Sequence, residues 1–366
     1  MIKKLYFSVR NFDWWLFAFI LILIIFGILI IYSVGMNSET VGSTRFYKQI
    51  IFAVVGLIIL FIISCIDYRL FNNYAYILYG IGIILLIAVL FSSPIRGTTG
   101  WFNIGFLSFQ PVEIAKIFLV IFLARFFSLQ AFSMDKIKNI ILSGIFTAIY
   151  VILVLIQPDL GSALIFIGLW IAFLLLSNVN KKQLLILFLI LAIIAVSSWF
   201  VILKDYQKER ILTFIDPGQD SLKTGYNVLQ SIIAVGSGKL YGRGLGLGPQ
   251  SQLNFLPEQE ADFIFAVICE ELGFFGALLI IILFTLIFYR IWSIAKNAQD
   301  DFTSYLAYGI LIIIFIQTMI NIGMNIGLMP ITGLSLPWIS AGGSSLIVNL
   351  LLVGLLESMY QHENLT

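Results

Sequence analysis

The sequence predicts an all-α integral membrane protein with ten transmembrane helices and one large extracellular loop between helices seven and eight. Hydrophobic residues make up 60% of the 366 positions and charged residues only 11%, too few to coat a soluble surface of this size. Apolar runs of bilayer-spanning length recur along the chain. The main polar stretch, 204–262, lies between two such runs. We expect one polytopic membrane domain over residues 1–366.

The ten predicted spans follow the apolar runs in chain order. They cover residues 14–34, 47–66, 74–92, 111–128, 139–156, 160–177, 183–203, 263–289, 304–325 and 342–360. The first run lacks a small-residue cleavage site, which favours a first span over a removable signal. Between the fifth and sixth spans, Pro158 disfavours helix at Gln157 and Asp159 is costly in lipid, so we predict a turn there.

Two segments leave their local structure open. Pro257, Glu258 and Glu260 are typical of a helix start, whereas the cleanly apolar run begins only at Leu272. Segment 257–271 is therefore either an interfacial helix or the first turns of an inserted one. Segment 330–345, rich in Gly, Ser and Pro, is either an irregular connection packed against protein or a plain loop.

Positive charges in the short connections indicate the orientation. With the N-terminus inside, the cytoplasmic side holds Lys3, Lys4, Arg10, Arg69, Arg125, Lys136, Lys138, Lys181, Lys182, Arg290 and Lys296, and the short outer connections hold Arg45, Lys48 and Arg96. Both termini are therefore predicted to be cytoplasmic and segment 204–262 extracellular. A net charge of +2 gives no broad basic face, so nucleic acid is not expected as a partner.

The polar segment contains a glycine-rich run, residues 236–248, which read GSGKLYGRGLGLG. Glycines let a backbone approach a ligand closely and present its amides to phosphate oxygens. This run is not a nucleotide-binding P-loop, because Leu240 follows Lys239 where Ser or Thr is required. Lys239 and Arg243 are candidates for pairing with a lipid pyrophosphate. A flexible loop with incidental glycines and solvated cations explains the composition equally well.

The fourth predicted span carries a charged pair, Glu113 and Lys116, one helical turn apart. Isolated charges in lipid are expensive, so the two should pair toward the bundle interior. One interpretation is an ion pair that only locks helices together. The other is that the pair lines a cavity, where Lys116 can exchange Glu113 for an anionic ligand group.

A longer set of motifs runs through the chain in fixed order. Residues 250–265 read QSQLNFLPEQEADFIF and continue to ELG at 271–273; the other blocks are QPVEIAK (110–116), QPDLG (157–161), RILTF (210–214), GYNVLQS (225–231) and NIGLMPITGLSLPWISAGGSS (325–345). Together they resemble the SEDS family (shape, elongation, division and sporulation) over nearly the whole chain. The short N-terminal tail and overall length are most similar to its elongation members. Ala341 departs from the family, which often has an aromatic residue there.

The resemblance implies a peptidoglycan glycosyltransferase that polymerises lipid II into glycan strands at the outer face of the bacterial cytoplasmic membrane during elongation. Such an inverting transfer needs a base for the acceptor 4-hydroxyl and positive charge or a metal for the leaving pyrophosphate. The motif implies Asp262 as that base; by spacing alone it reads as a helix-start carboxylate. The implied substrate-binding residues are Glu113, Lys116, Asp159, Arg210, Lys239, Arg243, Glu258, Ser344 and Ser345.

Some expectations about these residues depend on local structure. Glu258 shares a face with Asp262 if the helix is continuous, where it could bind metal or tune the base. Arg210 and Lys116 are the stronger pyrophosphate candidates, because they belong to family blocks, although ordinary ion pairing explains them equally well. Mg²⁺ or Mn²⁺ would suit pyrophosphate departure, but no metal-ligand spacing is present, and no organic cofactor is expected.

The resemblance also implies a partner, a class B penicillin-binding protein that crosslinks the new glycan. Two rival functions remain at this stage. A lipid-linked precursor flippase would also have many spans and intramembrane charge, but the candidate groups here cluster toward one face of the membrane. A noncatalytic membrane scaffold for cell-wall synthesis would have no activity of its own.

Overall fold

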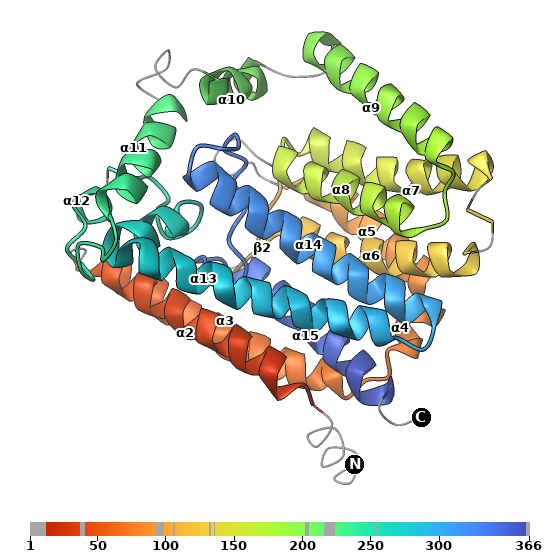
Figure 1. Cartoon of the computed structure of the whole chain (residues 1–366), viewed down its shortest axis with the longest axis horizontal. Helices are drawn as coiled ribbons and strands as arrows, with labels where there is room; N and C mark the ends of the chain where they lie inside the picture. Colours follow the sequence, from red (N-terminus) through yellow and green to blue (C-terminus); the bar gives the residue numbers. More distant parts are fainter. Residues whose placement is uncertain are drawn as a thin grey trace.

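The computed structural model describes residues 12–36, 41–92, 99–104, 107–131, 133–134, 136–201, 205–215, 224–253 and 255–363. Long helices dominate the fold (Figure 1). They are α2 (Trp14–Gly35), α3 (Val41–Ser64), α5 (Ala75–Val89), α6 (Pro111–Leu129), α7 (Ile137–Ile156), α8 (Leu160–Leu176), α9 (Lys181–Val201), α13 (Ile264–Asn297), α14 (Asp301–Asn325) and α15 (Gly343–Glu363). Each predicted apolar run falls on one of these helices. The all-helical prediction is confirmed.

Several helices have the length and composition to cross a membrane. Within the described residues, 6 helices meet this description: α2, α3, α7, α13, α14 and α15. Helices α5 and α8 are apolar but shorter. The chain is therefore a multi-pass membrane protein.

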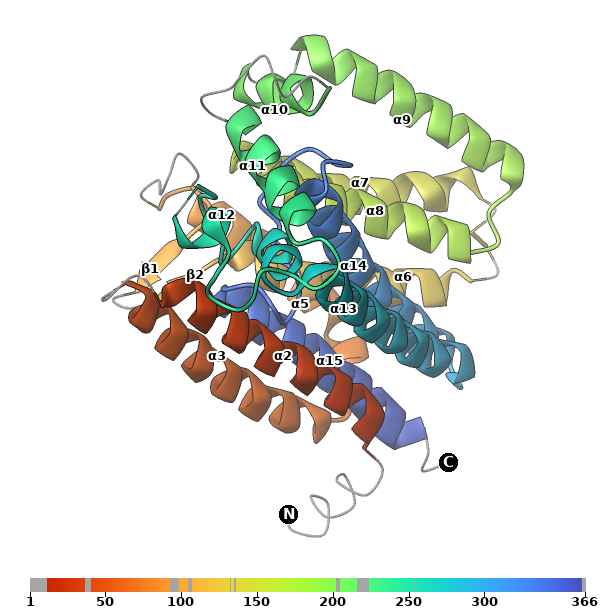
Figure 2. The same ribbon diagram turned by 60° about the vertical axis from the view of Figure 1, so that its left-hand side comes forward.

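The two ends of the helix bundle are defined by side-chain contacts. Asp13, before α2, donates its backbone N–H to Glu357 of α15 at 3.0 Å and accepts Nη2 of Arg290 in α13 at 2.6 Å. We call this the termini end. At the opposite end, Ser33 of α2 donates to Glu271 of α13 at 2.7 Å. We call this the loop end, because α11 and α12 lie beside it in both views (Figures 1 and 2).

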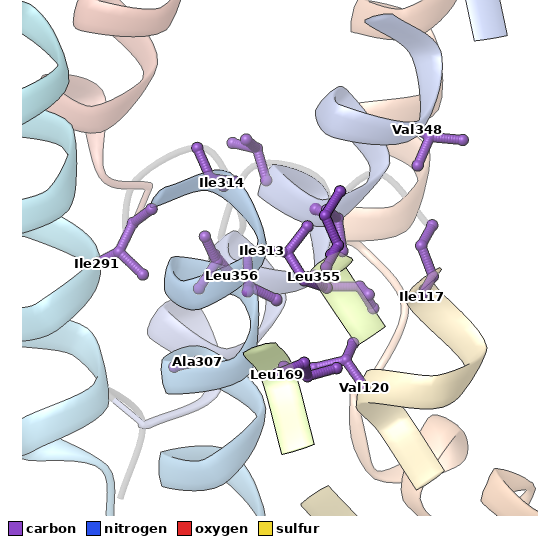
Figure 3. Close-up of a cluster of buried hydrophobic side chains, with 14 of the residues drawn as sticks. Ile117, Val120, Leu169, Ile291, Ala307, Ile313, Ile314, Val348, Leu355 and Leu356 are labelled. Atoms are coloured by element: carbon purple, nitrogen blue, oxygen red, sulfur yellow. The ribbon is translucent and has the colours of Figure 1, made fainter. Parts of the chain in front are cut away.

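The centre of the bundle is apolar and closely packed. Val120 of α6, Ile313 of α14 and Leu356 of α15 are fully buried in one cluster (Figure 3). Helix α6 buries residues all around its circumference, as expected for a helix surrounded by protein. Helices α6 and α15 begin at the loop end and α14 finishes there, so three helices carry side chains from the core up to that end.

The polar segment 204–262 has more regular structure than its composition suggested. It contains α10 (Asp205–Ile215), α11 (Thr224–Ser237) and the short α12 (Pro249–Gln252). Helix α11 buries Val228, Ser231 and Ala234 at a spacing of three, which places them on one face. Ser231 donates to the carbonyl of Asn325 at 2.8 Å. The segment is therefore folded onto the bundle through α11 instead of forming one long loop.

The predicted helix start at Pro257 is wrong. Residues 257–263 form turns, and α13 begins only at Ile264. Glu258 has a φ of 51°, and its carbonyl accepts the N–H groups of Ala261 and Asp262 at 3.0 Å each. This left-handed residue closes a turn that a continuous helix cannot contain. Glu258 and Asp262 therefore do not share a helical face.

Helix α13 is interrupted at Gly273, whose φ is 66°. The interruption leaves backbone groups of α13 without helical partners, and the glycine-rich run forms hydrogen bonds with them. Arg243 and Gly244 donate to the carbonyls of Glu270 and Glu271 at 3.0 and 2.9 Å, and Phe274 donates to the carbonyl of Lys239 at 2.9 Å. Because buried backbone groups need partners, this run completes the helix break.

Gly238, Gly242 and Gly248 of this run are required by close contact with α13. A Cβ at Gly238 would overlap the carbonyl of Cys269, and one at Gly248 would overlap the side chain of Glu270. Glu270 in turn accepts the backbone N–H groups of Gln250 and Ser251 at 2.8 and 3.0 Å. The glycines are thus not incidental, and the amides of Arg243 and Gly244 are already bonded within the chain.

Other local expectations have mixed outcomes. The predicted turn at 157–159 is confirmed, since α7 ends at Ile156 and α8 begins at Leu160. The connection between α14 and α15 is irregular and packed against protein, because Leu336, Trp338 and Ile339 are buried. The sequence analysis missed an antiparallel hairpin of β1 (Phe102–Ile104) and β2 (Leu107–Phe109). Its three-residue strands are too short for alternation to stand out.

We predict that Gly242→Ala destabilises the protein. Gly242 has a φ of 78°, and a Cβ there would overlap the carbonyl of Glu271. The combined strain should lower the free energy of unfolding by about 1–3 kcal/mol. Thermal unfolding of the detergent-solubilised chain measures this. Gly236→Ala in α11, where a Cβ meets nothing within 4 Å, is the control and should unfold no earlier than the wild type. Equal unfolding temperatures for the two variants would refute the role of Gly242.

Candidate active site

A pocket at the loop end gathers five of the predicted site residues. Its empty volume is about 570 Å³, part of it open to solvent. It is lined by Trp101, Gln110, Glu113, Asp159, Ser162, Ala261, Asp262, Gly333, Leu334, Ser335, Ala341, Gly342, Ser344 and Ser345. The predicted residues among these are Glu113, Asp159, Asp262, Ser344 and Ser345. Four parts of the chain, residues 101–113, 159–162, 261–262 and 333–345, therefore converge on one concave surface.

Three helices begin at this pocket. Helix α6 starts at Pro111, α8 at Leu160 and α15 at Gly343, each next to lining residues. The N-terminal end of a helix carries a partial positive charge and unpaired N–H groups. The pocket therefore combines carboxylate side chains with a backbone field that favours an anionic ligand.

Asp262 is fixed through its backbone. Its carbonyl accepts Nδ2 of Asn321 and Nδ2 of Asn325, each at 3.0 Å. Both asparagines are fully buried on α14, and Oδ1 of Asn325 also accepts the N–H of Ala266 at 2.9 Å. The Asp262 side chain is only partly buried and lines the pocket. The main chain of Asp262 is thus held by α14, while its carboxylate lines the pocket.

The connection between α14 and α15 holds the other side of the Asp262 turn. Ser340 donates to the carbonyl of Ala261 at 2.6 Å, and the N–H of Ala341 donates to the carbonyl of Glu260 at 2.8 Å. A Cβ placed on Gly333 would lie 3.7 Å from Oδ2 of Asp262. This connection therefore forms the wall that faces the carboxylate.

Sequence reasoning missed Asn321, although a signal for it was present. Asn321 and Asn325 are spaced four residues apart in a mostly apolar run, which puts two amides on one helix face. Amides in a membrane helix should face the protein interior. Asn325 was noticed only as part of a motif. The backbone-holding role of both residues depends on where the chain before α13 lies, which the sequence does not reveal.

Glu113 and Lys116 form the predicted ion pair. Nζ of Lys116 lies 2.8 Å from Oε2 of Glu113, and the lysine side chain is 1% exposed. Glu113 lines the pocket, whereas Lys116 lies one turn deeper in α6 and does not. The pair therefore presents its carboxylate to the pocket and keeps its ammonium beneath.

Asp159 and the two serines belong to a hydrogen-bond network around the pocket. Asp159 caps α8 by accepting the N–H and the O–H of Ser162 at 2.9 and 2.8 Å. Ser344 donates to the carbonyl of Ser108 at 3.1 Å and accepts the N–H of Gln110 at 3.3 Å. Ser345 is 2.9 Å from the hydroxyl of Ser335. The contacts of Ser344 tie α6, β2 and α15 together at the rim.

The remaining predicted residues lie elsewhere. Lys239 and Arg243 line a separate depression formed by residues 237–243, where Nε of Arg243 donates to Ser237 at 3.2 Å. Glu258 is in the turn before Asp262 but is not among the pocket-lining residues. Arg210 belongs to α10, and its side chain lies outside the described residues.

A second ion pair stands next to the Asp262 turn. Nη1 of Arg45 in α3 is 3.1 Å from Oε2 of Glu260. Burial raises the pKa of Glu260, and the nearby Arg45 cation partly offsets that rise. The sequence analysis assigned Arg45 only to an outer connection, so this contact is another finding of the structure.

The described residues do not form a ready-made metal site. Across the parts of the chain that are described, no three His, Cys, Asp or Glu side chains group as metal ligands. Of the pocket carboxylates, Glu113 is paired with Lys116 and Asp159 is bonded to Ser162. The pocket therefore lacks the set of oxygen ligands that Mg²⁺ or Mn²⁺ would need from protein alone.

Comparison with known proteins identifies the family. The model of the cell cycle protein family FtsW/RodA/SpoVE matches residues 13–365. This chain belongs to that family. A peptidoglycan glycosyltransferase MrdB of Escherichia coli K12 is 35% identical over 371 residues, covering 99% of this chain and 97% of the relative. The stage V sporulation protein E of Bacillus subtilis is 36% identical over 360 residues, covering 93% and 95%.

A solved structure also resembles this member of the FtsW/RodA/SpoVE family. It comes from work on polymerization and crosslinking by a peptidoglycan synthase complex, and it matches with a TM-score of 0.83. The two chains are 28% identical, and the match covers 96% of this chain and 98% of the other. The family resemblance predicted from the motifs is confirmed.

We predict a pH-dependent loss of stability for Arg45→Met. The pKa of Glu260 is higher in the folded state than in the unfolded chain, so ionising this carboxyl reduces stability as the pH rises through that interval. Without Arg45, nothing from that cation offsets the rise in the pKa of Glu260, so ionising the buried Glu260 carboxyl costs more folding free energy. The unfolding temperature should therefore fall more at pH 7.5 than at pH 5. Lys48→Met, which removes an exposed cation from the same helix, is the control. An equal loss at both pH values would contradict the coupling.

We predict that Lys116→Met destabilises the protein more than the paired change Glu113→Leu/Lys116→Met. Removing one partner leaves a buried uncompensated charge, which costs about 3–5 kcal/mol, whereas removing both does not. Chemical unfolding of the solubilised chain compares the two. If Lys116 instead exchanges Glu113 for an anionic ligand, Lys116→Met will reduce activity per folded molecule more than stability.

Proposed function

We propose that this chain is a peptidoglycan glycosyltransferase that polymerises lipid II at the outer face of the bacterial cytoplasmic membrane during cell elongation. Membership of the FtsW/RodA/SpoVE family supports this proposal, as do relatives named peptidoglycan glycosyltransferase. A relative named RodA and a solved structure described as a rod shape determining protein support an elongation role. The observation that carries the mechanism is the Asp262 carboxylate in a pocket flanked by three helix N-termini.

In the proposed reaction, Asp262 acts as the general base. Its carboxylate takes the proton of the acceptor 4-hydroxyl as that oxygen attacks the anomeric carbon of the lipid-linked donor. The bond from that carbon to the pyrophosphate oxygen breaks, and undecaprenyl pyrophosphate leaves with the bonding electrons. The reaction is a single displacement with inversion. The hydrogen bonds from Asn321 and Asn325 to the Asp262 carbonyl support this role, because a base must be held at a defined distance.

The leaving pyrophosphate needs positive charge, and the pocket offers it in part through backbone. The N-terminal ends of α6, α8 and α15, with the hydroxyls of Ser344 and Ser345, suit anionic oxygens. Lys116 would reach them only by exchanging Glu113, and Glu258, Arg210, Lys239 and Arg243 remain candidate contacts for other parts of the substrate. Mg²⁺ or Mn²⁺ would supply further positive charge for the leaving group, although the described carboxylates form no group of three that could hold the ion.

The proposed topology has ten spans with both termini in the cytoplasm. Contacts among Asp13, Arg290 and Glu357 place the start of α2 and the last part of α15 at one end of the bundle, as an even number of spans requires. Lys and Arg residues in the short connections put that end inside. The pocket at the loop end would then open toward the outer face, where lipid-linked sugars are polymerised.

We propose a class B penicillin-binding protein as partner. The similar solved structure belongs to a peptidoglycan synthase complex whose description joins polymerization with crosslinking. Crosslinking is a separate transpeptidation, for which a second catalytic chain is the simplest source.

The rival functions make different predictions for purified lipid II. A flippase would move the lipid across the bilayer without forming polymer. A noncatalytic scaffold would give polymer only when a partner enzyme is added. Glycan polymer made by this chain alone in liposomes, without net transfer of lipid II, would favour the glycosyltransferase over both.

We predict that Asp262→Asn abolishes glycan polymerisation and leaves the fold intact. The amide has nearly the same shape but cannot accept the hydroxyl proton, so the rate should fall at least about a hundredfold. Gel electrophoresis of glycan made from labelled lipid II measures the rate, and size-exclusion profile and unfolding temperature report the fold. Asp301→Asn, at an exposed position in α14, is the matched control. Normal polymer from folded Asp262→Asn protein would remove Asp262 from the role of base.

A further inference from the structure

Beneath the pocket, three buried polar side chains have unused hydrogen-bonding atoms. They are Lys116 of α6, Gln317 of α14 and Asn349 of α15, each 1% exposed. Among the described residues, no hydrogen-bond partner is found for Nε2 and Oε1 of Gln317 or for Oδ1 of Asn349. Nζ of Lys116 has one partner, the Glu113 carboxylate. We call these three residues the polar layer.

The faces of the three helices show that these residues converge. Lys116 is four residues from Val120, Gln317 is four from Ile313 and Asn349 is seven from Leu356, so each shares a helix face with its apolar counterpart. Val120, Ile313 and Leu356 are buried in one cluster (Figure 3). In every case the polar residue lies toward the loop end of the helix. These spacings put the polar layer on the loop-end side of the apolar cluster.

The same helices relate the polar layer to the pocket. Glu113 is three residues above Lys116, and Ser345 is four above Asn349; both line the pocket. Asn321, which binds the Asp262 carbonyl, is four above Gln317. At a rise of 1.5 Å per residue, the polar layer lies about 5–6 Å below the pocket lining. Nδ2 of Asn349 donates to Ser345 at 3.3 Å, which connects the two levels.

The chemistry of the polar layer selects its ligand. An ammonium has three donors, and each amide oxygen of Gln317 and Asn349 is an acceptor. Each such group left unbonded in the interior costs about 1–3 kcal/mol. A metal cation is disfavoured because Lys116 is already positive and its one carboxylate neighbour is paired with it. A neutral molecule that both donates and accepts hydrogen bonds is required.

We infer that the polar layer is a buried water site, in which ordered water bridges Lys116 to Gln317 and Asn349. Water bonded to Nζ of Lys116 holds that ammonium beside Glu113, and so fixes the Glu113 carboxylate in the pocket wall. Buried waters of this kind make about three hydrogen bonds to groups that the protein leaves unpaired. Gln317 and Asn349 are positioning residues in this arrangement, since they act on the pocket only through Lys116 and Glu113.

The sign of a stability change tests the inference. If water fills the polar layer, Gln317→Leu removes hydrogen-bond partners of that water. The unfolding temperature of the full-length chain in detergent should then fall by at least about 3 °C. If the layer is dry, the same change removes an unbonded amide and should raise the unfolding temperature. Thr318→Val is the matched control, because Thr318 is buried beside Gln317 and its hydroxyl donates to Ile314 of its own helix at 2.8 Å. An unchanged or raised temperature for Gln317→Leu would overturn the water site.

A double-mutant cycle tests the bridge itself. The combined variant Lys116→Met/Gln317→Leu should lose less than the sum of the two single shifts, whereas the cycle of Lys116→Met with Thr318→Val should be additive. Additive shifts in both cycles would contradict the bridge.

A map of the wild-type chain tests the site without any substitution. At a resolution that shows water, it should contain density bounded by Nζ of Lys116, Oε1 of Gln317 and Oδ1 of Asn349. Continuous protein contact between these atoms, with no intervening density, would overturn the proposal. Neither the map nor the unfolding measurements depend on lipid II polymerisation.

Discussion

Two buried amides determine where the proposed base stands. Asn321 and Asn325 bond the carbonyl of Asp262, and through further bonds they reach Leu334 and Ala266. They thereby join the turn before α13, the connection after α14 and α14 itself. A buried carbonyl without a partner costs about 1–3 kcal/mol. The hydrogen bonds from the two amides therefore favour the position in which each of these segments meets α14. The pocket is consequently built around a main-chain atom of Asp262, and the Asp262 side chain lines the pocket.

The break in α13 serves the same end of the molecule. A helix uninterrupted through Gly273 would have no free carbonyls at Glu270 and Glu271 for the glycine-rich run to bind. Because the run crosses at backbone contact distance, it anchors residues 238–248 of the polar segment to α13. Glu270 and Glu271 add side-chain bonds to Gln250, Ser251, Gly246 and Ser33. Buried carboxylates are stabilised here by local N–H and O–H donors, which explains how two acids are tolerated in adjacent positions.

Polar groups in the centre of the bundle are ordered by depth. The pocket lining carries the carboxylates, the polar layer lies below it, and the apolar cluster of Val120, Ile313 and Leu356 closes the interior (Figure 3). Helices α6 and α15 supply members to each level, and α14 supplies members to the lower two levels. The charged pair of this central region is Glu113 and Lys116, which compensate one another. The arrangement by depth also places the pocket-lining groups close to the end at which α11 and α12 lie beside the bundle.

The sequence by itself determined the membrane class, the positions of the ten long helices and the turn at 157–159. These features depend on the length and composition of continuous runs, and a run of apolar residues needs no knowledge of its neighbours. The motifs also supplied the family and five residues that line the pocket. Only the tertiary structure decided that α13 starts after Asp262, that Asn321 and Asn325 hold it, and that Lys239 and Arg243 stand apart. Such features depend on hydrogen bonds between residues far apart in the chain. A local sequence pattern does not specify which residues will be partners in these bonds.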